Sequence, residues 1–266
     1  MRRCRAEVLA KAHNAGMHRL LISLVRWFCI LTTLAWAATG VAQPLLVTVD
    51  DNNPPFMYAR NGQATGVYPA IVRIAFARMG VPVTLEAKPW ARALAELGRG
   101  QAAVAGIYRT EERAQRFDFS DPLLTENIAV FVRKPQGYKF SGIADLAGKT
   151  VGTVRGWSYG DAFDSARKRG LFIAEDTRSD QQNFEKLANG RLDAVLAIEE
   201  AGLAIVQASR AGTTGPLKPY LASNPAHVAF PKGSSNAALL PRLNKAIADM
   251  KKDGELDRLL MEELTR

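Results

Sequence analysis

The sequence predicts an α/β fold with two units, between which the chain passes twice. From Leu45 onward, short β-branched runs alternate with helical stretches of about ten to fifteen residues, a pattern typical of largely parallel strands joined by helices. A stretch around Pro135 and Gly142 separates a first unit from a second. A late strand at 227–230 returns to the first unit and makes the second crossing.

In the first unit each element follows from its local residues. The β-branched and apolar runs predict strands at 45–49, 83–87, 102–107 and 127–132. Proline in the first turn and glycine just past the end delimit two helices, 69–79 and 89–99. The last strand leaves this unit toward the second.

The second unit repeats the alternation of strands and helices. The expected strands are 149–154, 171–175 and 192–198, and the expected helices are 158–169, 179–188 and 199–210. Two terminal helices follow at about 236–252 and 255–264. We expect lobe 1 to comprise residues 43–132 and 230–266 and lobe 2 residues 133–229, with hinges near Val132-Arg133 and Ala229-Phe230.

The first 42 residues have the order of a signal peptide. Basic residues extend to Arg26, an uncharged apolar run covers 27–38, and small residues stand three and one positions before a cut after Ala42. Threonines and glycine dilute the run below a convincing membrane anchor, which is the alternative. Either Met1 or Met17 is the start of translation. We expect a soluble protein exported to the periplasm.

Composition excludes several classes of function. Residues 1–42 carry most of the net charge of +9, and the remainder holds 29 basic and 25 acidic residues without a basic stripe, which argues against nucleic-acid binding. Both cysteines, Cys4 and Cys29, fall in the leader, so the exported part has no disulfide. A single histidine, His227, follows the leader. We therefore expect no metal and no cofactor.

The pentapeptide Gly156-Trp157-Ser158-Tyr159-Gly160 matches the nucleophile elbow of serine hydrolases. A catalytic triad there depends on His227 alone. The alternative is that Ser158 caps the helix 158–169, with Asp161 three residues later completing a capping box. We prefer a third role, in which the free N–H groups of the turn from Gly156 to Tyr159 receive an anionic group of a ligand.

Polar and aromatic side chains follow the strand ends of the first unit. In open α/β sheets ligands bind in the crevice beyond the carboxyl ends of the strands, where these positions converge. Arginine suits bidentate capture of a carboxylate, and tryptophan or tyrosine suits a flat or cationic ligand face. The predicted binding residues are Asp50, Trp90, Arg92, Tyr108, Arg113, Trp157, Ser158, Tyr159 and Glu199.

Several motifs resemble those of the bacterial extracellular solute-binding protein family 3. The motifs are Val49-Asp50-Asp51-Asn52-Asn53-Pro54-Pro55-Phe56, Gly66-Val67, Thr110-Glu111-Glu112-Arg113 and Phe117-Asp118-Phe119-Ser120-Asp121-Pro122, then Leu146-Ala147-Gly148-Lys149-Thr150-Val151-Gly152 and Gly190-Arg191-Leu192-Asp193-Ala194-Val195. The resemblance implies the two-lobed type II periplasmic-binding fold with two hinge crossings. It implies that Arg113 grips a ligand carboxylate, that Trp90 stacks on the ligand and that Ser158 is a donor from lobe 2.

The sequence also departs from the pattern of that family. Ile198 stands at the position of the family's amine-binding aspartate, Tyr108 replaces a small hydroxyl residue, and Asn53 replaces an aromatic. Glu199 either replaces the lost carboxylate or is an ordinary acid in the first turn of a helix. The resemblance therefore implies an amino acid or a related carboxylate-bearing ligand.

The predicted function is that of a monomeric periplasmic receptor that delivers its ligand to an ABC permease in the inner membrane. Two other classes stay open. The first is a cleft enzyme on the same fold, either the serine hydrolase or a dehydratase with Glu199 as general acid. The second is a sensor that docks on a membrane receptor once it has bound its ligand.

Overall fold

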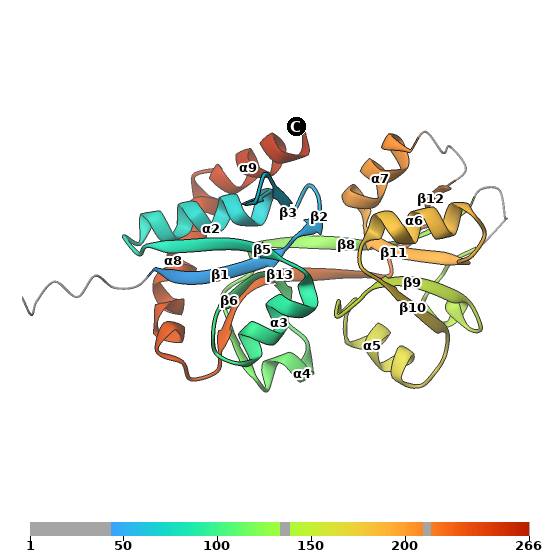
Figure 1. Cartoon of the computed structure of the whole chain (residues 1–266), viewed down its shortest axis with the longest axis horizontal. Coiled ribbons are helices and arrows are strands. Elements are labelled where there is room, and N and C mark those ends of the chain that lie inside the picture. The colour runs from blue at the N-terminus through green and yellow to red at the C-terminus, as the bar shows by residue number, and fades with distance from the viewer. Residues whose placement is uncertain (1–43, 134–138, 210–213, 266) are drawn as a thin grey trace, which may run out of the picture. The chain divides into compact units, whose positions relative to one another are not determined.

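A ten-stranded sheet runs through the part of the protein that the computed structural model describes, residues 44–133, 139–209 and 214–265 (Figure 1). The strand order is β10-β9-β11-β8-β13-β6-β1-β5, with β12 on β8 and β7 on β13. The predicted signal peptide, 1–42, lies outside the described residues. Within the described residues, no helix is long and apolar enough to cross a membrane.

The first half of the sheet is built on three parallel strands. They are β1 (Leu45–Asp50), β5 (Val83–Lys88) and β6 (Ala103–Tyr108), and β1 lies between the other two. Helices α2 (Val67–Arg78), α3 (Trp90–Gly98) and α4 (Glu111–Ala114) follow in the order that the sequence predicts, except that the short α4 was not expected. A small sheet of β2 (Asn52–Asn53), β3 (Met57–Arg60) and β4 (Gln63–Thr65) precedes α2.

The end of the chain completes this half. Helices α8 (Leu240–Lys252) and α9 (Glu255–Leu264) pack against α2. Arg78 of α2 forms ion pairs with Asp253, at 2.7 Å, and with Glu255, at the junction of the two terminal helices. Residues about 175 positions apart in the chain are thus joined, as a fold with two crossings requires.

The second half has the same architecture around three parallel strands. They are β9 (Thr150–Val154), β10 (Ile173–Thr177) and β11 (Ala194–Ile198), and they alternate with α5 (Asp161–Lys168), α6 (Asp180–Ala188) and α7 (Glu199–Ala208). Every residue of β6 and of β11 is buried, because helices and loops cover both faces of these strands. The remaining elements are β7 (Phe117–Phe119), η1 (Ile143–Leu146), β12 (Thr214–Pro216) and η2 (Ser235–Leu239).

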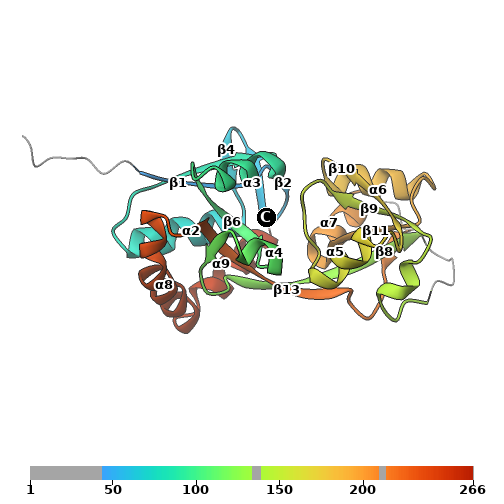
Figure 2. The ribbon, with the colours of Figure 1, turned by 90° about the horizontal axis from the view of Figure 1, so that it is seen from below.

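Two long antiparallel strands, β8 (Leu124–Arg133) and β13 (Ala222–Pro231), connect the halves (Figure 2). They pair with each other from Leu124↔Ala226 to Ile128↔Ala222. Beyond this segment, β8 pairs with β11 of the second half and β13 pairs with β6 of the first. Both strands are longer than the predicted 127–132 and 227–230, because Glu126 and Pro225 interrupt the apolar pattern that the prediction used.

Candidate functional site

Residues of both halves line one small cavity beside the crossing strands. The cavity has a volume of about 10 Å³, which is close to the room that one water molecule needs. Its lining residues come from the carboxyl ends of strands, from the crossing strand β8 and from the loop after β9, and they are Met57, Trp90, Gly106, Tyr108, Arg113, Glu126, Trp157 and Ser158. The topology thus brings together the strand ends at which the sequence predicts a ligand site.

Arg113 is the cation of this cavity. Thr110 caps the four-residue α4, with its hydroxyl oxygen accepting from the Arg113 N–H at 3.2 Å, and this fixes where the arginine leaves the backbone. The guanidinium donates from Nη1 to the Tyr108 carbonyl at 3.0 Å and from Nη2 to the Gly156 carbonyl at 3.2 Å. Burial lowers the pKa of Arg113, and the nearby Asp164 only partly offsets this. Since arginine stays charged, the site holds a desolvated cation.

Two tryptophans form hydrogen bonds from one half of the sheet to the other. Trp90 donates from Nε1 to the Gly156 carbonyl at 3.0 Å, and Trp157 donates from Nε1 to Asp50 Oδ2 at 2.9 Å. Their rings meet edge to face, with centroids 6.3 Å apart. The aromatic wall of the cavity is therefore held in place from both sides.

Asp50 ends β1 and is almost fully buried, with an exposed fraction of 3%. Burial raises its pKa to about 6, although hydrogen bonds from Trp157 and from the Asn52 N–H act in the opposite direction. Asp180 begins α6 and is also buried; burial, together with the charge of Asp50, raises its pKa to about 7. Two carboxyl groups near the cleft thus favour their protonated forms.

A third carboxyl group, Glu126, lies on the crossing strand β8 and was not predicted as a site residue. Its Oε1 accepts a hydrogen bond from the Tyr68 hydroxyl and its Oε2 accepts one from the Tyr108 hydroxyl. Burial raises the pKa of Glu126 to about 7 and outweighs these two hydrogen bonds. The sequence did contain a signal for this residue, because Glu126 is an acid near the start of a strand that crosses between the halves. The predicted strand, 127–132, began one residue after it.

These three acids make the free energy of unfolding depend on pH. Each has a higher pKa in the folded protein than in the unfolded chain, so the folded state binds more protons and loses stability as the pH rises through about 4 to 7. We expect unfolding to cost about 2 kcal/mol more at pH 6 than at pH 8, after allowing for an opposing contribution from His227, whose pKa burial lowers. Urea titrations at the two pH values measure this, and Glu126→Gln should remove about a third to a half of the difference. Equal stability at both pH values would contradict the assignment.

Six of the nine predicted binding residues meet at the cleft. Trp90, Tyr108, Arg113, Trp157 and Ser158 line the cavity, and Asp50 contacts it through Trp157. The other three do not reach it.

The structure does not bring Arg92, Tyr159 and Glu199 to this cavity. The Arg92 side chain is 71% exposed and its ion pair is with Glu96, since a residue two positions after Trp90 on a helix faces another way. Tyr159 is fully buried, accepts a hydrogen bond from the Val154 N–H at 2.9 Å and packs on Phe163. Glu199 binds Lys218 at 2.8 Å and the Tyr220 hydroxyl at 2.5 Å, on the return segment of the second half.

The loop from Gly156 to Gly160 also differs from the prediction. Helix α5 begins at Asp161 with Gly160 at its N-cap, so Ser158 neither caps the helix nor starts it. The Ser158 hydroxyl accepts from the Gly160 N–H at 3.2 Å and donates to Asp164. The loop presents the carbonyl of Gly156 to Arg113 and Trp90, rather than the row of N–H groups that we expected to bind an anion.

The contacts also weaken both enzyme hypotheses. The hydrogen-bond partner of His227 is the Ser120 carbonyl, at 2.8 Å, and His227 does not line the cavity with Ser158. The pKa of Glu199 is lowered, because its bonds to Lys218 and Tyr220 outweigh the effect of burial, whereas a general acid needs a raised pKa. Among the described residues, no cluster of three or more His, Cys, Asp or Glu side chains is arranged to hold a metal ion.

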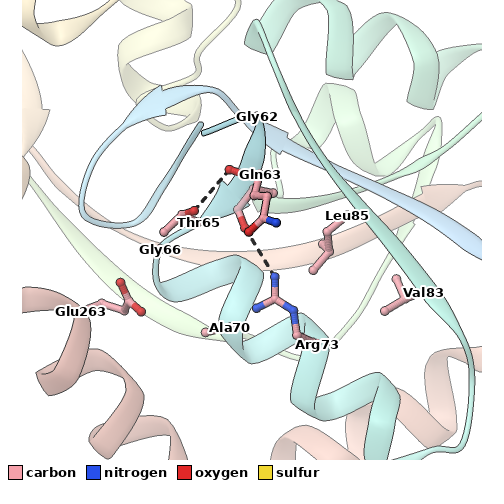
Figure 3. Close-up of a pocket in the computed structure, with 10 residues that line it drawn as sticks. Gly62, Gln63, Thr65, Gly66, Ala70, Arg73, Val83, Leu85 and Glu263 are labelled. Carbon is pink, nitrogen blue, oxygen red and sulfur yellow. Dashed lines mark hydrogen bonds between the residues drawn. The ribbon is translucent and has the colours of Figure 1, made fainter. Parts of the chain in front are cut away.

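A larger groove of about 560 Å³ lies elsewhere in the first half (Figure 3). It is bounded by β4, α2, β5 and Glu263 of α9. Its side chains are engaged locally: Arg73 donates to the Ala64 carbonyl at 3.5 Å and Thr65 to the Gln63 carbonyl at 3.2 Å. No residue of the second half lines it. Residues of both halves do line the small cavity and an adjoining cavity of about 360 Å³, and these two cavities share Arg113, Trp157 and Ser158.

Two α/β halves that share two crossing strands and both line the cavity between them define a periplasmic-type solute-binding protein. The profile of the bacterial extracellular solute-binding proteins, family 3, matches residues 45–263, and the chain belongs to this family. The predicted fold class, family and binding function without catalysis are thereby confirmed.

Individual relatives agree with this assignment. The L-cystine-binding protein TcyJ of Escherichia coli strain K12 is 29% identical over 218 residues, which cover 81% of this chain and 80% of that protein. An ancestral arginine-binding protein, solved bound to arginine, is 28% identical with a TM-score of 0.72 and covers 83% of this chain and 98% of its own. A histidine kinase sensor domain that resembles periplasmic binding proteins shares the fold, with a TM-score of 0.73 and 24% identity, over 84% of this chain and 96% of its own.

Proposed function

We propose that the protein captures an amino acid or a related small carboxylate in the periplasm and presents it to an ABC permease. The observation that carries this proposal is Arg113, a desolvated guanidinium that donates hydrogen bonds to two backbone carbonyls, one from each half. A ligand carboxylate is a stronger acceptor than a peptide carbonyl and takes two parallel N–H bonds from arginine. A ligand carboxylate that takes the place of the Gly156 carbonyl as acceptor on Arg113 forms the stronger hydrogen bonds. This exchange therefore favours the ligand-bound state of the protein.

The names of the relatives support the choice of ligand class. One relative is described as an L-cystine-binding protein and another was solved with arginine. Trp90 and Trp157 provide apolar faces for the carbon chain of such a ligand, and Ser158 provides a hydroxyl beside them. These groups suit a small molecule with one carboxylate and a partly apolar body.

The same proposal includes export of the protein to the periplasm and its interaction with the permease. Residues 1–42 direct the chain to the periplasm and are removed, so that the working protein starts near Gln43. It works as a monomer, because the receptor role needs a single cleft and a free outer surface for the permease.

The pairing of the crossing strands supports lobe boundaries slightly different from those expected. Val130 and Phe131 pair with β11 of the second half, and Val228 and Ala229 pair with β6 of the first. We place the hinges where β8 and β13 pair only with each other, at 125–127 and 223–225. Lobe 1 then ends before Glu126 and resumes after Pro225. Closure would bend a two-stranded ribbon rather than the body of either sheet.

The direct test is a binding screen of the purified protein. We expect at least one of L-cystine, L-arginine and L-glutamine to raise the melting temperature and to give a saturable isotherm by titration calorimetry. A protein that binds only its natural ligand in the folded state is stabilised by about 2.7 kcal/mol at a concentration of 100 times Kd. Absence of binding by all three, together with binding of sugars or metal ions, would contradict the amino-acid assignment.

A further inference from the structure

The cavity between the halves is lined by a half-buried guanidinium and a buried carboxyl group. Arg113 contributes the cation and Glu126 the carboxyl group, and both line the same small space. Among the described residues, neither forms an ion pair: Arg113 donates to two carbonyls, and Glu126 accepts from two tyrosine hydroxyls. Two ionisable groups therefore line the cavity, and among the described residues neither has an ion-pair partner.

A buried carboxylate without a counter-charge is costly in free energy. Its hydration is lost, and neutral hydroxyl donors replace only part of it. Glu126 is only 4% exposed, and burial raises its pKa to about 7. The neighbouring acid Glu200 adds repulsion. A cation in the cavity would remove this cost, because it favours the ionised form.

The other acidic side chains near the cleft already have hydrogen-bond or ion-pair partners within the protein. Asp164 accepts from Ser158 and lines the adjoining cavity, which shares Arg113 with the small one, but it does not line the small cavity beside Glu126. Asp50 accepts from Trp157 and does not line the cavity itself. Glu199 is paired with Lys218, and the preceding Ile198 is apolar and fully buried. Glu126 is thus the acid that a ligand in this cavity meets.

We propose that Glu126 binds a cationic group of the ligand, an ammonium or a guanidinium, while Arg113 binds its carboxylate. The ligand class is then a zwitterion rather than a simple carboxylic acid. This inference rests on the proposed function, since it assumes that the ligand binds beside Arg113 once the halves move apart and enlarge this space of about 10 Å³. Tyr68 and Tyr108 are positioning residues, because their hydroxyls fix the two oxygens of Glu126.

Matched ligands that differ only in the α-ammonium test the proposal. The pairs are L-arginine with 5-guanidinopentanoate, L-cystine with 3,3′-dithiodipropionate, and L-glutamine with 4-carbamoylbutanoate. Calorimetry is run on wild type, on Glu126→Gln and on the control Glu199→Gln, which removes an acid outside the cavity. Glutamine is nearly isosteric with glutamate, and melting curves confirm that each variant is folded.

We expect wild type to bind the amino acid of at least one pair about tenfold or more tightly than its deaminated partner, as expected for a hydrogen bond to a charged group. Glu126→Gln should remove this preference by weakening only the amino acid. Glu199→Gln should change each Kd by less than about twofold. If Glu126→Gln weakens both arginine probes but not L-citrulline, the recognised cation is the guanidinium, which also supports the proposal.

A second measurement keeps the proposal testable if Glu126→Gln fails to fold. Binding of a cation at Glu126 should release a proton near pH 7, so wild-type affinity for the amino acid rises from pH 6 to pH 8 relative to the deaminated analogue. The groups that face Glu126 are Tyr68 of α2, Tyr108 of β6 and Glu200 of α7, with Arg113 of α4 across the cavity. The contrast between paired ligands cancels contributions from acids such as Asp50 and Asp180.

The outcomes separate this inference from the proposed function. The proposal fails if wild type binds both members of each pair equally and Glu126→Gln weakens neither arginine probe, or if an ammonium preference is unchanged in Glu126→Gln. Glu126 then does not bind a cation, while carboxylate binding at Arg113 stands. Binding of none of the six probes would overturn both proposals.

Discussion

Replacing Arg113 by alanine should abolish measurable binding of the amino acid that the screen identifies, or weaken it by more than about 100-fold. Loss of one member of a buried, hydrogen-bonded charge pair costs about 2 to 5 kcal/mol, and tenfold in Kd corresponds to about 1.4 kcal/mol. The effect is large because the guanidinium is desolvated and the ligand carboxylate would be left without a partner. Titration calorimetry gives the Kd of each variant.

Two further variants define the cause of that loss. Arg113→Lys keeps the charge but not the planar fork, and it should cost about 2 kcal/mol. Arg92→Ala is the matched control, since Arg92 lies in the same half with a largely exposed side chain and should bind as wild type does. A melting curve for each variant separates loss of a contact from loss of the fold. Wild-type affinity in Arg113→Ala would contradict the carboxylate assignment.

The largest loss of stability is expected for Gly66→Ala. Gly66 has φ 110° and ψ −176°, a conformation that is essentially restricted to glycine. A Cβ there would lie 2.6 Å from the Pro55 carbonyl oxygen and 2.7 Å from that of Phe56, both backbone atoms that cannot turn away. We expect the free energy of unfolding to fall by more than about 3 kcal/mol in a urea titration.

The close approach at Gly66 matters to the site. It lets the N–H groups of Val67 and Tyr68 bond to those same carbonyls, at 3.2 and 3.0 Å, and so sets the first turn of α2. Tyr68 then reaches Glu126. Gly62→Ala is the control: Gly62 also has a positive φ, of 76°, but a Cβ would meet nothing within 4 Å, so only about 1 kcal/mol should be lost. Equal losses in the two variants would show that the backbone contact carries no cost of its own.

Much of the fold was predictable because its signals are local. The alternation of strands and helices, and proline and glycine at the ends of α2 and α3, depend on residues close together in the chain. The association of the terminal helices with the first half was expected from the family resemblance, and in the structure α8 and α9 pack on α2. The lengths of the crossing strands β8 and β13 were underestimated. A polar residue in a strand interrupts the apolar pattern of the sequence, but the backbone hydrogen bonds to the neighbouring strands continue through it.

The site was predictable only in part. Arg113, Trp90 and Ser158 were identified through motifs, and the structure brings them together. Arg92 and Tyr159 stand next to true cavity residues in the sequence but point elsewhere, because one residue of helix or loop rotates a side chain away from its neighbour. Glu126 was missed because its role depends on Tyr68 and Tyr108, which lie 58 and 18 residues away.

The sequence by itself determined the class of fold, the family and the arginine to which we assign carboxylate binding, since each rests on short motifs and on local periodicity. Only the tertiary structure decided that a carbonyl of Gly156, rather than its N–H groups, faces Arg113, and that Glu126 rather than Glu199 faces the cavity. Both outcomes depend on where helices begin and on which strands cross, and these are set by packing between segments far apart in the chain. The charge pattern that selects the ligand is therefore a property of the assembled sheet.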